Sequence, residues 1–195
     1  IIFRRLNIAK ENYRQLGGVS PIVGYTKRLV RRLQKIVDAD VFYEMRYTYP
    51  FAKDVMEKIK NYDEIYAIPM YPHHSQTTTL SSIEDFMDCA KSYKIEQKVK
   101  TIDSYYDNPL YNKAIVDRIK EALKNDKAED FELVFSAHGL TQKIIDKGDL
   151  YQKHILANVE CVKKELKLQG INFKKIDVAY QSRVGPMKWL QPYME

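Results

Sequence analysis

From residue 41 onward the chain alternates short apolar segments with longer amphipathic segments, and this alternation constrains its fold more than any other feature. The short segments have the length and composition of strands, whereas the longer ones repeat apolar residues at helical spacing. Strands are expected at residues 41–46, 64–70, 99–104, 131–136 and 174–181. Helices are expected at residues 7–16, 22–37, 51–61, 82–93, 110–125 and 151–169. Such alternation is typical of α/β proteins with parallel sheets flanked by helices.

The turn Asp-Asn-Pro at residues 107–109 is the expected seam between two domains. A chain of 195 residues can form one large α/β domain or two small ones. We therefore expect a first domain over residues 1–107 and a second over residues 108–195. The chain begins at Ile1 without an initiator methionine and stops shortly after Pro192, so we also expect a fragment of a longer protein.

The composition, 45% hydrophobic and 30% charged, is that of a soluble globular protein. Charges interrupt every apolar run well before the roughly 18 residues that suggest a membrane-spanning helix, and no apolar signal segment opens the chain. Cys89 and Cys161 have neither zinc-ligand spacing nor Cys-x-x-Cys spacing. The two cysteines therefore favour a reduced, cytoplasmic compartment.

The net charge of +6 is concentrated in the expected helix at residues 22–37, which also carries an apolar stripe. Its basic side chains are Lys27, Arg28, Arg31, Arg32 and Lys35. A solvated helix face is the first interpretation, and a surface that attracts anionic lipid or an acidic substrate is the second. Peripheral membrane contact therefore stays open. Nucleic acid comes last and is not expected as a partner, because no recognised nucleic-acid module accompanies the patch.

Segments that follow strands are the places to look for a ligand, because open α/β sheets bind ligands beyond the carboxyl ends of their strands. This rule selects residues 46–50, 69–82, 105–109, 137–142 and 182–189. In the fourth of these segments, an apolar strand delivers His138 to its carboxyl edge between small neighbours. An imidazole titrates near neutrality and binds first-row divalent metals, so His138 is a candidate for both proton transfer and metal binding. A histidine that only hydrogen-bonds a loop is the competing interpretation.

The hydroxyl-rich segment at residues 71–82 leads into an expected helix. Its hydroxyl groups are suited to an anion at the helix N-terminus, but an N-cap with turn residues is the more frequent case. Joint metal chelation by His73 and His74 is not expected, because neighbouring side chains in an extended segment point to opposite faces.

Two further segments have an unusual choice of residues. After the last strand, residues 181–190 carry Arg183, Met187 and Trp189, which would suit a large flat ligand with acidic edges. Residues 16–21 contain a Gly-Gly turn followed by Ser20 and Pro21, which indicates a helix start with Ser20 as N-cap. That turn lacks the spacing of a dinucleotide-binding or phosphate-binding loop.

Taken in order, these segments resemble the ferrochelatase family over nearly the whole chain. The motifs that carry the resemblance are Gly-Gly-x-Ser-Pro at 17–21, Met-Arg-Tyr at 45–47 with Pro-Phe at 50–51, Tyr-Pro at 71–72 with Ser75 and the threonines at 77–79, Tyr-Asp at 106–107, Ser-Ala-His-Gly-Leu at 136–140, and Gln-Ser-Arg-Val-Gly-Pro at 181–186 with Trp-Leu at 189–190. The resemblance implies two Rossmann-like domains with parallel sheets flanked by helices, the first lacking its opening strand and the second truncated.

The resemblance also implies an activity, the insertion of Fe²⁺ into protoporphyrin IX in the last step of haem synthesis. Ferrous iron is then the substrate metal, no organic cofactor is expected, and any iron–sulfur cluster lies outside what the chain can show. His138 matches the family's histidine for metal binding and proton removal, and the partner glutamate is expected after Glu195. The implied porphyrin-binding residues are Tyr13, Ser20, Arg46, Tyr47, Tyr106, Ser182, Arg183 and Trp189.

The sequence departs from the family pattern at Leu80, Thr141 and Tyr180, where glycine, proline and tryptophan are usual. Two other functions remain open. One is a non-catalytic porphyrin-binding fragment. The other is a related chelatase that acts on cobalt and a sirohydrochlorin-type tetrapyrrole, against which the segment at 181–189 argues.

Overall fold

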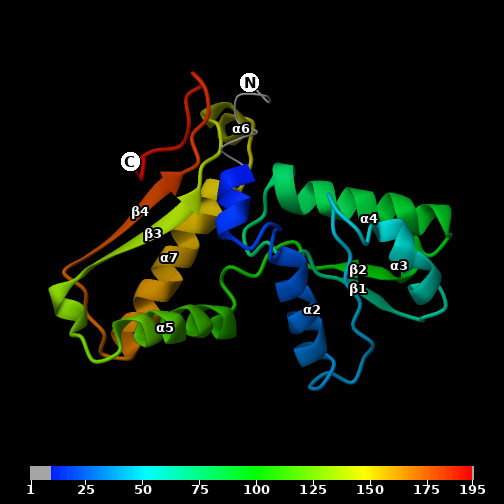
Figure 1. Ribbon diagram of the computed structural model, residues 1–195, viewed down its shortest axis with the longest axis horizontal. Coiled ribbons are helices and arrows are strands. Elements are labelled where there is room, and N and C mark those ends of the chain that lie inside the picture. Colours follow the sequence, from blue (N-terminus) through cyan, green and yellow to red (C-terminus); the bar gives the residue numbers. More distant parts are fainter. Residues whose placement is uncertain (1–9, 195) are drawn as a thin grey trace. The chain divides into compact units, whose positions relative to one another are not determined.

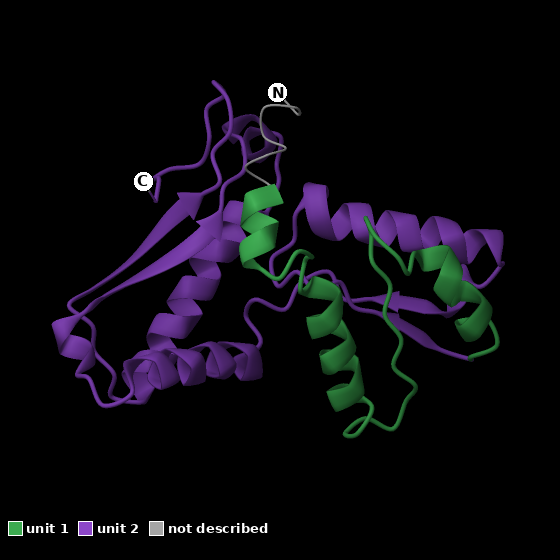
Figure 2. Cartoon of the chain, viewed as in Figure 1, with its two compact units in different colours: residues 1–62 green, residues 63–195 purple. Residues whose placement is uncertain are grey.

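The computed structural model describes residues 10–194. The chain divides into two compact units, Ile1–Tyr62 and Asp63–Glu195 (Figure 2). This boundary differs from the seam expected near residue 107, which concerns the domains of the whole protein and stays a prediction. The part of the expected helix at 7–16 that precedes residue 10 lies outside the described residues.

The first unit is mainly helical. Residues 10–15 form a helix, α2 spans Ile22–Leu33 and α3 spans Ala52–Ile59. The expected helices are confirmed, although α2 ends four residues earlier than its apolar stripe indicated. It begins at Ile22, so Pro21 rather than Ser20 occupies the N-cap position. The main-chain N–H of Phe51 donates to the Asp54 carboxylate at 2.8 Å, which caps α3.

The prediction of a strand at residues 41–46 is wrong. These residues belong to no strand, and their main chain bonds locally instead. The N–H of Val41 donates to Gln34 Oε1 at 2.8 Å, and the N–H of Met45 donates to the Pro50 carbonyl at 2.7 Å. A strand requires a neighbour with which to exchange main-chain bonds, and here the N–H groups of Val41 and Met45 bind Gln34 and Pro50 instead.

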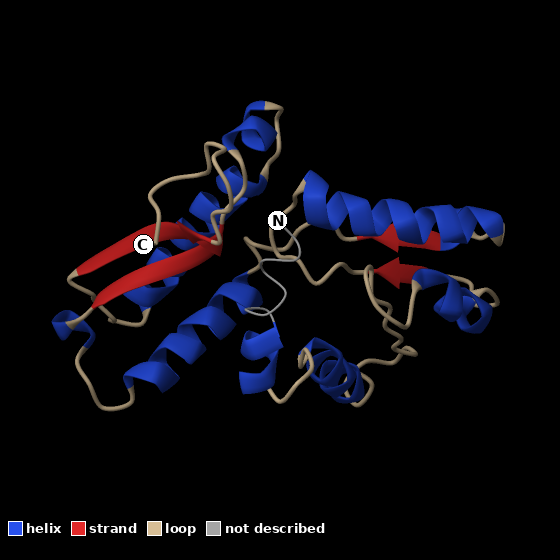
Figure 3. Cartoon of the chain, turned by 45° about the horizontal axis from the view of Figure 1, so that its top comes forward, coloured by secondary structure: helices blue, strands red, loops and turns tan. Residues whose placement is uncertain are grey.

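The second unit contains two parallel strand pairs (Figures 1 and 3). In one, β1 (Ile65–Ala67) pairs with β2 (Val99–Thr101). In the other, β3 (Glu132–His138) pairs with β4 (Lys175–Gln181). The predicted α/β class with parallel pairing is therefore confirmed.

Helices follow these strands as the alternation predicts. They are α4 (Ser81–Ser92), α5 (Pro109–Leu123) and α7 (Tyr151–Leu168). The structure adds α6 (Gln142–Asp146) and a π-helical turn (Gln76–Leu80) that leads directly into α4, where a loop had been expected. The side chain of Asn108 caps α5 by accepting the N–H of Leu110 at 2.9 Å.

The core beneath β3 and β4 is built by α5 and α7. Val116 of α5 packs with Val162 and Leu166 of α7, and half-buried side chains of both strands surround this cluster. Leu166 is only 1% exposed, and full burial of such a side chain stabilises a fold by about 1.5–3 kcal/mol. Over residues 10–194, no helix is both long and apolar enough to cross a membrane.

Candidate functional site

The carboxyl ends of β3 and β4 form the centre of the candidate site. Their register places His138 opposite Gln181, at the last position of both strands. Ala137 is buried beneath the edge, whereas His138 itself is exposed. The sheet therefore presents the imidazole at the edge where parallel sheets bind ligands, as the strand-end argument predicts.

Gly139 allows the two strand ends to approach closely. Its N–H donates to the Gln181 carbonyl at 2.8 Å. A Cβ at this position would lie 2.8 Å from the same oxygen and 3.5 Å from a ring carbon of Trp189. Only glycine fits between the main chain of β4 and the indole, so the residue beside His138 is fixed by packing.

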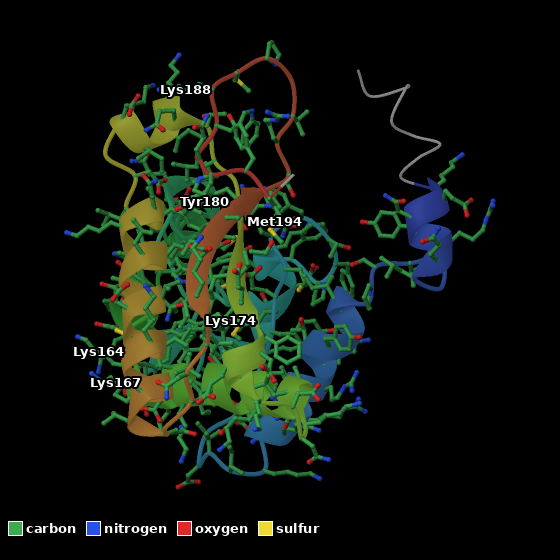
Figure 4. All side chains as sticks on the ribbon, turned by 90° about the vertical axis from the view of Figure 1, so that its left-hand side faces the viewer. Lys164, Lys167, Lys174, Tyr180, Lys188 and Met194 are labelled. Atoms are coloured by element: carbon green, nitrogen blue, oxygen red, sulfur yellow. The ribbon has the colours of Figure 1, made fainter. Side chains whose placement is uncertain are left out.

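The loop after β4 folds back onto the loop after β3. The N–H of Gln142 donates to the Lys188 carbonyl at 2.9 Å, and the N–H of Leu190 donates to the Leu140 carbonyl at 2.9 Å. Figure 4 shows Lys188 in this loop, beyond Tyr180 near the end of β4. The two motifs at 136–140 and 181–190 therefore form one continuous edge around His138.

Three predicted porphyrin-binding residues lie on this edge. Ser182 has a left-handed main chain, with φ of 70°. The Arg183 guanidinium carbon lies 4.4 Å from the centre of the Tyr193 ring. The half-buried indole of Trp189 donates its Nε1–H to the Val184 carbonyl at 3.1 Å, which fixes the orientation of the ring. The edge thus combines a cation with flat aromatic groups, as a large flat anionic ligand requires.

The hydroxyl-rich segment is capped from within the chain. Ser75 Oγ, 1% exposed, donates to the Asp149 carboxylate at 2.9 Å, and the N–H of Gln76 donates to the same oxygen at 2.8 Å. Ser75 Oγ also accepts the N–H of Thr77 at 3.2 Å. Of the two interpretations, the N-cap is therefore confirmed, and the anion at this terminus is the chain's own buried carboxylate.

One face of α7 binds the residues just before that cap. His73 Nε2 donates to Asn158 Oδ1 at 3.1 Å. The N–H of His74 donates to His154 Nδ1 at 3.1 Å. His154 and Asn158 are 8% and 6% exposed, so the contacts lie in the interior. Neighbouring residues of the loop thus reach successive turns of the helix.

Tyr151, at the start of α7, joins this loop to the His138 edge. Its N–H donates to Asp149 at 2.9 Å, and its ring lies edge-on to the His73 ring, with centroids 6.1 Å apart. Burial raises the pKa of the Tyr151 hydroxyl, while a hydrogen bond with the His138 main chain opposes that rise. Tyr151 also packs against the buried cluster that includes Ala137.

Burial determines the charge state of the two interior histidines. It lowers the pKa of His73 and of His154 below 6.5, because a charged imidazole loses its hydration when it is buried. The acceptor role of His154 Nδ1 requires an unprotonated nitrogen in any case. Both rings are therefore neutral near pH 7.

The structure brings together only part of the predicted site. His138, Ser182, Arg183 and Trp189 share the edge just described, and Tyr106 lies against His73 and His154 in the same unit. Tyr13, Ser20, Arg46 and Tyr47 lie in the first unit, and their place beside His138 stays a prediction. There, the Arg46 guanidinium carbon lies 5.2 Å from the centre of the Tyr47 ring.

The structure also identifies residues that sequence reasoning missed, namely Asp149, Tyr151, His154 and Asn158. The last three follow one another at helical spacing and lie on the apolar stripe of α7 with Ile155 and Val159. Polar residues within an apolar stripe were the sequence signal for these buried contacts. Polar groups are buried only where they can form hydrogen bonds with other groups. Among residues 10–194, no group of three or more histidine, cysteine, aspartate and glutamate side chains is arranged to hold a metal.

The chain is similar in sequence to known proteins. A family model described as Ferrochelatase matches residues 1–195. Ferrochelatases of Campylobacter concisus and Wolinella succinogenes are 47% and 46% identical to the chain, over 96% and 98% of its length. That of Sulfurimonas denitrificans is 43% identical over 100%. The matched regions make up 60%, 62% and 63% of these relatives, so the chain spans about three fifths of their length.

Proposed function

Because this chain belongs to the ferrochelatase family, we propose that the full-length protein inserts Fe²⁺ into protoporphyrin IX to form haem. The observation that carries the proposal is the shared edge of β3 and β4. On it the main chain joins His138 to the loop of Ser182, Arg183 and Trp189. Iron and porphyrin are both substrates in this scheme, and no organic cofactor enters it.

His138 is proposed as the proton acceptor and as a ligand of the entering iron. Two pyrrole N–H protons must leave the macrocycle as Fe²⁺ enters, so each turnover releases two protons. An exposed imidazole at a strand end can take a proton from a pyrrole nitrogen and return it to water. Its unprotonated nitrogen is also a suitable donor to Fe²⁺ before the four porphyrin nitrogens bind the metal.

The aromatic and cationic groups of the edge are proposed to hold the porphyrin. Trp189 offers a flat face to the macrocycle, and Arg183 offers a cation to a propionate. A cleft that favours a bent macrocycle over a flat one would turn the nitrogen lone pairs toward the metal and lower the barrier. Tyr106 on the second unit, and Tyr13, Ser20, Arg46 and Tyr47 on the first, are proposed to complete the binding surface.

We also propose that α2 mediates peripheral contact with an anionic membrane surface. The helix has Arg31 and Arg32 in its last turn and no buried residue, while Tyr25 is 60% exposed. A basic amphipathic helix with exposed aromatic and apolar side chains suits the interface of anionic lipid. Cys89 and Cys161, which have neither zinc-ligand nor Cys-x-x-Cys spacing, support a cytoplasmic location with such contact, and no nucleic-acid partner is proposed.

The reaction is tested by anaerobic incubation of the full-length protein with Fe²⁺ and protoporphyrin IX, followed by absorbance and porphyrin fluorescence. We expect haem formation by the wild type and a loss of about 10²-fold or more in His138→Ala, with porphyrin still bound. Lys164→Gln, on the exposed outer side of α7 (Figure 4), is the matched control. Normal turnover by His138→Ala would overturn the role of the histidine.

Two further arms address the alternatives. Soret titration of the 195-residue chain, with turnover measured on the same sample, identifies a non-catalytic porphyrin-binding fragment if binding occurs without insertion. Competition with Co²⁺ and a sirohydrochlorin-type tetrapyrrole identifies the related chelatase if those substrates are preferred.

A further inference from the structure

The ring of Tyr106 contacts two histidine rings of the second unit. Its centroid is 4.2 Å from that of His154, at an interplanar angle of 30°. The His73 ring is stacked at 6.3 Å with an angle of 18°. The three rings come from the loop after β1, the loop after β2 and helix α7. The side chain of Tyr106 is thus restrained by two elements other than its own.

The main chain of Tyr106 is held as well. Its carbonyl accepts Asn158 Nδ2–H at 2.7 Å and Asn112 Nδ2–H at 3.1 Å. Asn158 Nδ2 also donates to Asn112 Oδ1 at 2.7 Å. The two amides are 6% and 4% exposed, so these bonds are buried. Two amides that are themselves fixed therefore position the residue's backbone.

Each histidine makes a hydrogen bond through a ring nitrogen. The face of its ring therefore remains available to pack against Tyr106. His154 Nδ1 accepts the N–H of His74 at 3.1 Å, and His73 Nε2 donates to Asn158 Oδ1 at 3.1 Å. Because both rings are neutral, they stack on the phenol as ordinary aromatic partners and bring no charge into the cluster. Nothing in the proposed chemistry at His138 uses these two side chains.

We propose that His73 and His154 are positioning residues that hold the Tyr106 ring in place for porphyrin binding. The inference rests on the proposed function, in which Tyr106 touches the macrocycle. A ring that is already ordered loses little conformational freedom when a flat ligand packs on it, so binding is tighter than it would be to a mobile side chain. The histidines thereby act on porphyrin affinity through Tyr106, without contact with the reacting atoms.

Two substitutions of His154 separate ring stacking from hydrogen bonding in the full-length protein. His154→Asn keeps an acceptor near the Nδ1 position for the His74 N–H and removes the ring. His154→Phe keeps an aromatic ring beside Tyr106 and removes the acceptor. We expect His154→Asn to raise the dissociation constant and KM for protoporphyrin about tenfold with kcat unchanged. We expect His154→Phe to stay within about threefold of the wild type in both constants.

A substitution of His73 tests the same proposal independently, in case the His154 variants fold poorly. His73→Gln offers a side-chain amide to Asn158 and removes the other ring, so it is also expected to weaken porphyrin binding with kcat preserved. Lys164→Gln serves again as the control on α7. Soret titration, steady-state kinetics and urea unfolding are measured on every variant.

A merely structural role for the histidines predicts a different order. Affinity would then follow the free energy of unfolding, and His154→Phe, which loses the bond to His74, would bind porphyrin no better than His154→Asn. That order overturns the inference, as does wild-type affinity in both His154→Asn and His73→Gln. If the wild type binds porphyrin and inserts iron while these variants match it, the proposed function stands and only the inference fails. A wild type that neither binds nor inserts overturns both.

Discussion

His154 accepts the main-chain N–H of His74 at 3.1 Å through Nδ1, and the bond exists only while that nitrogen carries no proton. Protonation would place two donors face to face in the interior of the second unit. The contact therefore ties the loop after β1 to α7 in a manner that depends on pH.

The first prediction is a loss of stability as the pH falls below about 6.5. Burial is the main cause of the lowered pKa of His154; the charges of His74 and Lys153 lower it further, and Asp107 and Asp149 oppose them. Because the folded pKa lies below the unfolded value, the unfolded chain binds the proton first. This stability is complete above 6.5 and is lost as pH falls through the folded pKa, at about 1.4 kcal/mol per pKa unit of difference.

Urea unfolding at pH 7.5 and pH 5.5 measures this effect. His154→Asn keeps an acceptor for the His74 N–H but does not titrate, so its free energy of unfolding should change less between the two pH values than that of the wild type. Equal changes in the two proteins would contradict the prediction.

The second prediction concerns Asp149, whose carboxylate accepts from Ser75 Oγ, the Gln76 N–H and the Tyr151 N–H. Asp149→Ala removes three bonds from a site that is 6% exposed. The free energy of unfolding should fall by about 2–4 kcal/mol, since buried donors are left without partners. Asp88→Ala breaks an exposed ion pair with Lys91 and should change it by less than about 1 kcal/mol. Similar losses in the two variants would show that the buried cap is not needed.

The third prediction tests the close approach at Gly139. Gly139→Ala places a methyl group 2.8 Å from the Gln181 carbonyl, so the strand ends must separate. We expect a loss of about 1–3 kcal/mol in the free energy of unfolding and a lower rate of iron insertion. Gly24→Ala, within α2 and with nothing within 4 Å of the new methyl group, should be neutral or stabilising by up to about 1 kcal/mol. An unaffected Gly139→Ala protein would rule out the tight fit.

The fourth prediction assigns the Tyr151 hydroxyl a part in holding His138. Tyr151→Phe removes the hydroxyl group, whose pKa reflects an interaction with the His138 main chain, while the ring stays beside His73. We expect kcat for iron insertion to fall about tenfold with KM for porphyrin unchanged, because a small displacement of a catalytic group is costly. Tyr111→Phe is the control, since burial also raises the pKa of Tyr111 but its ring contacts Tyr105. Equal rates in the two variants would exclude the role of Tyr151.

Several features of the fold could be read from the sequence because they depend on local patterns. The apolar run at residues 131–136 and the amphipathic run at 151–169 predicted β3 and α7 to within two residues at each end. The alternation of such runs predicted parallel pairing, which both strand pairs show. His138 at a strand end followed from the same local reasoning, since the carboxyl edge of a strand is set by where its apolar run stops.

What the local pattern could not supply was the choice of partners. Residues 41–46 have strand composition, yet Gln34 and Pro50 satisfy the main-chain groups of Val41 and Met45, and no neighbouring strand pairs there. The hydroxyls near Ser75 suited either an external anion or a cap, and the buried carboxylate of Asp149, distant in sequence, decided between them.

The sequence by itself determined the family, the class of fold and the strand-end histidine, because motifs and hydrophobic periodicity lie in neighbouring residues. Only the tertiary structure decided that the Tyr106 ring contacts both His73 and His154, and that Asn158 binds its carbonyl. These groups come from three segments far apart in the chain. They meet because α7 packs its buried face against the loops of another strand pair, and burial then requires every polar atom there to find a partner.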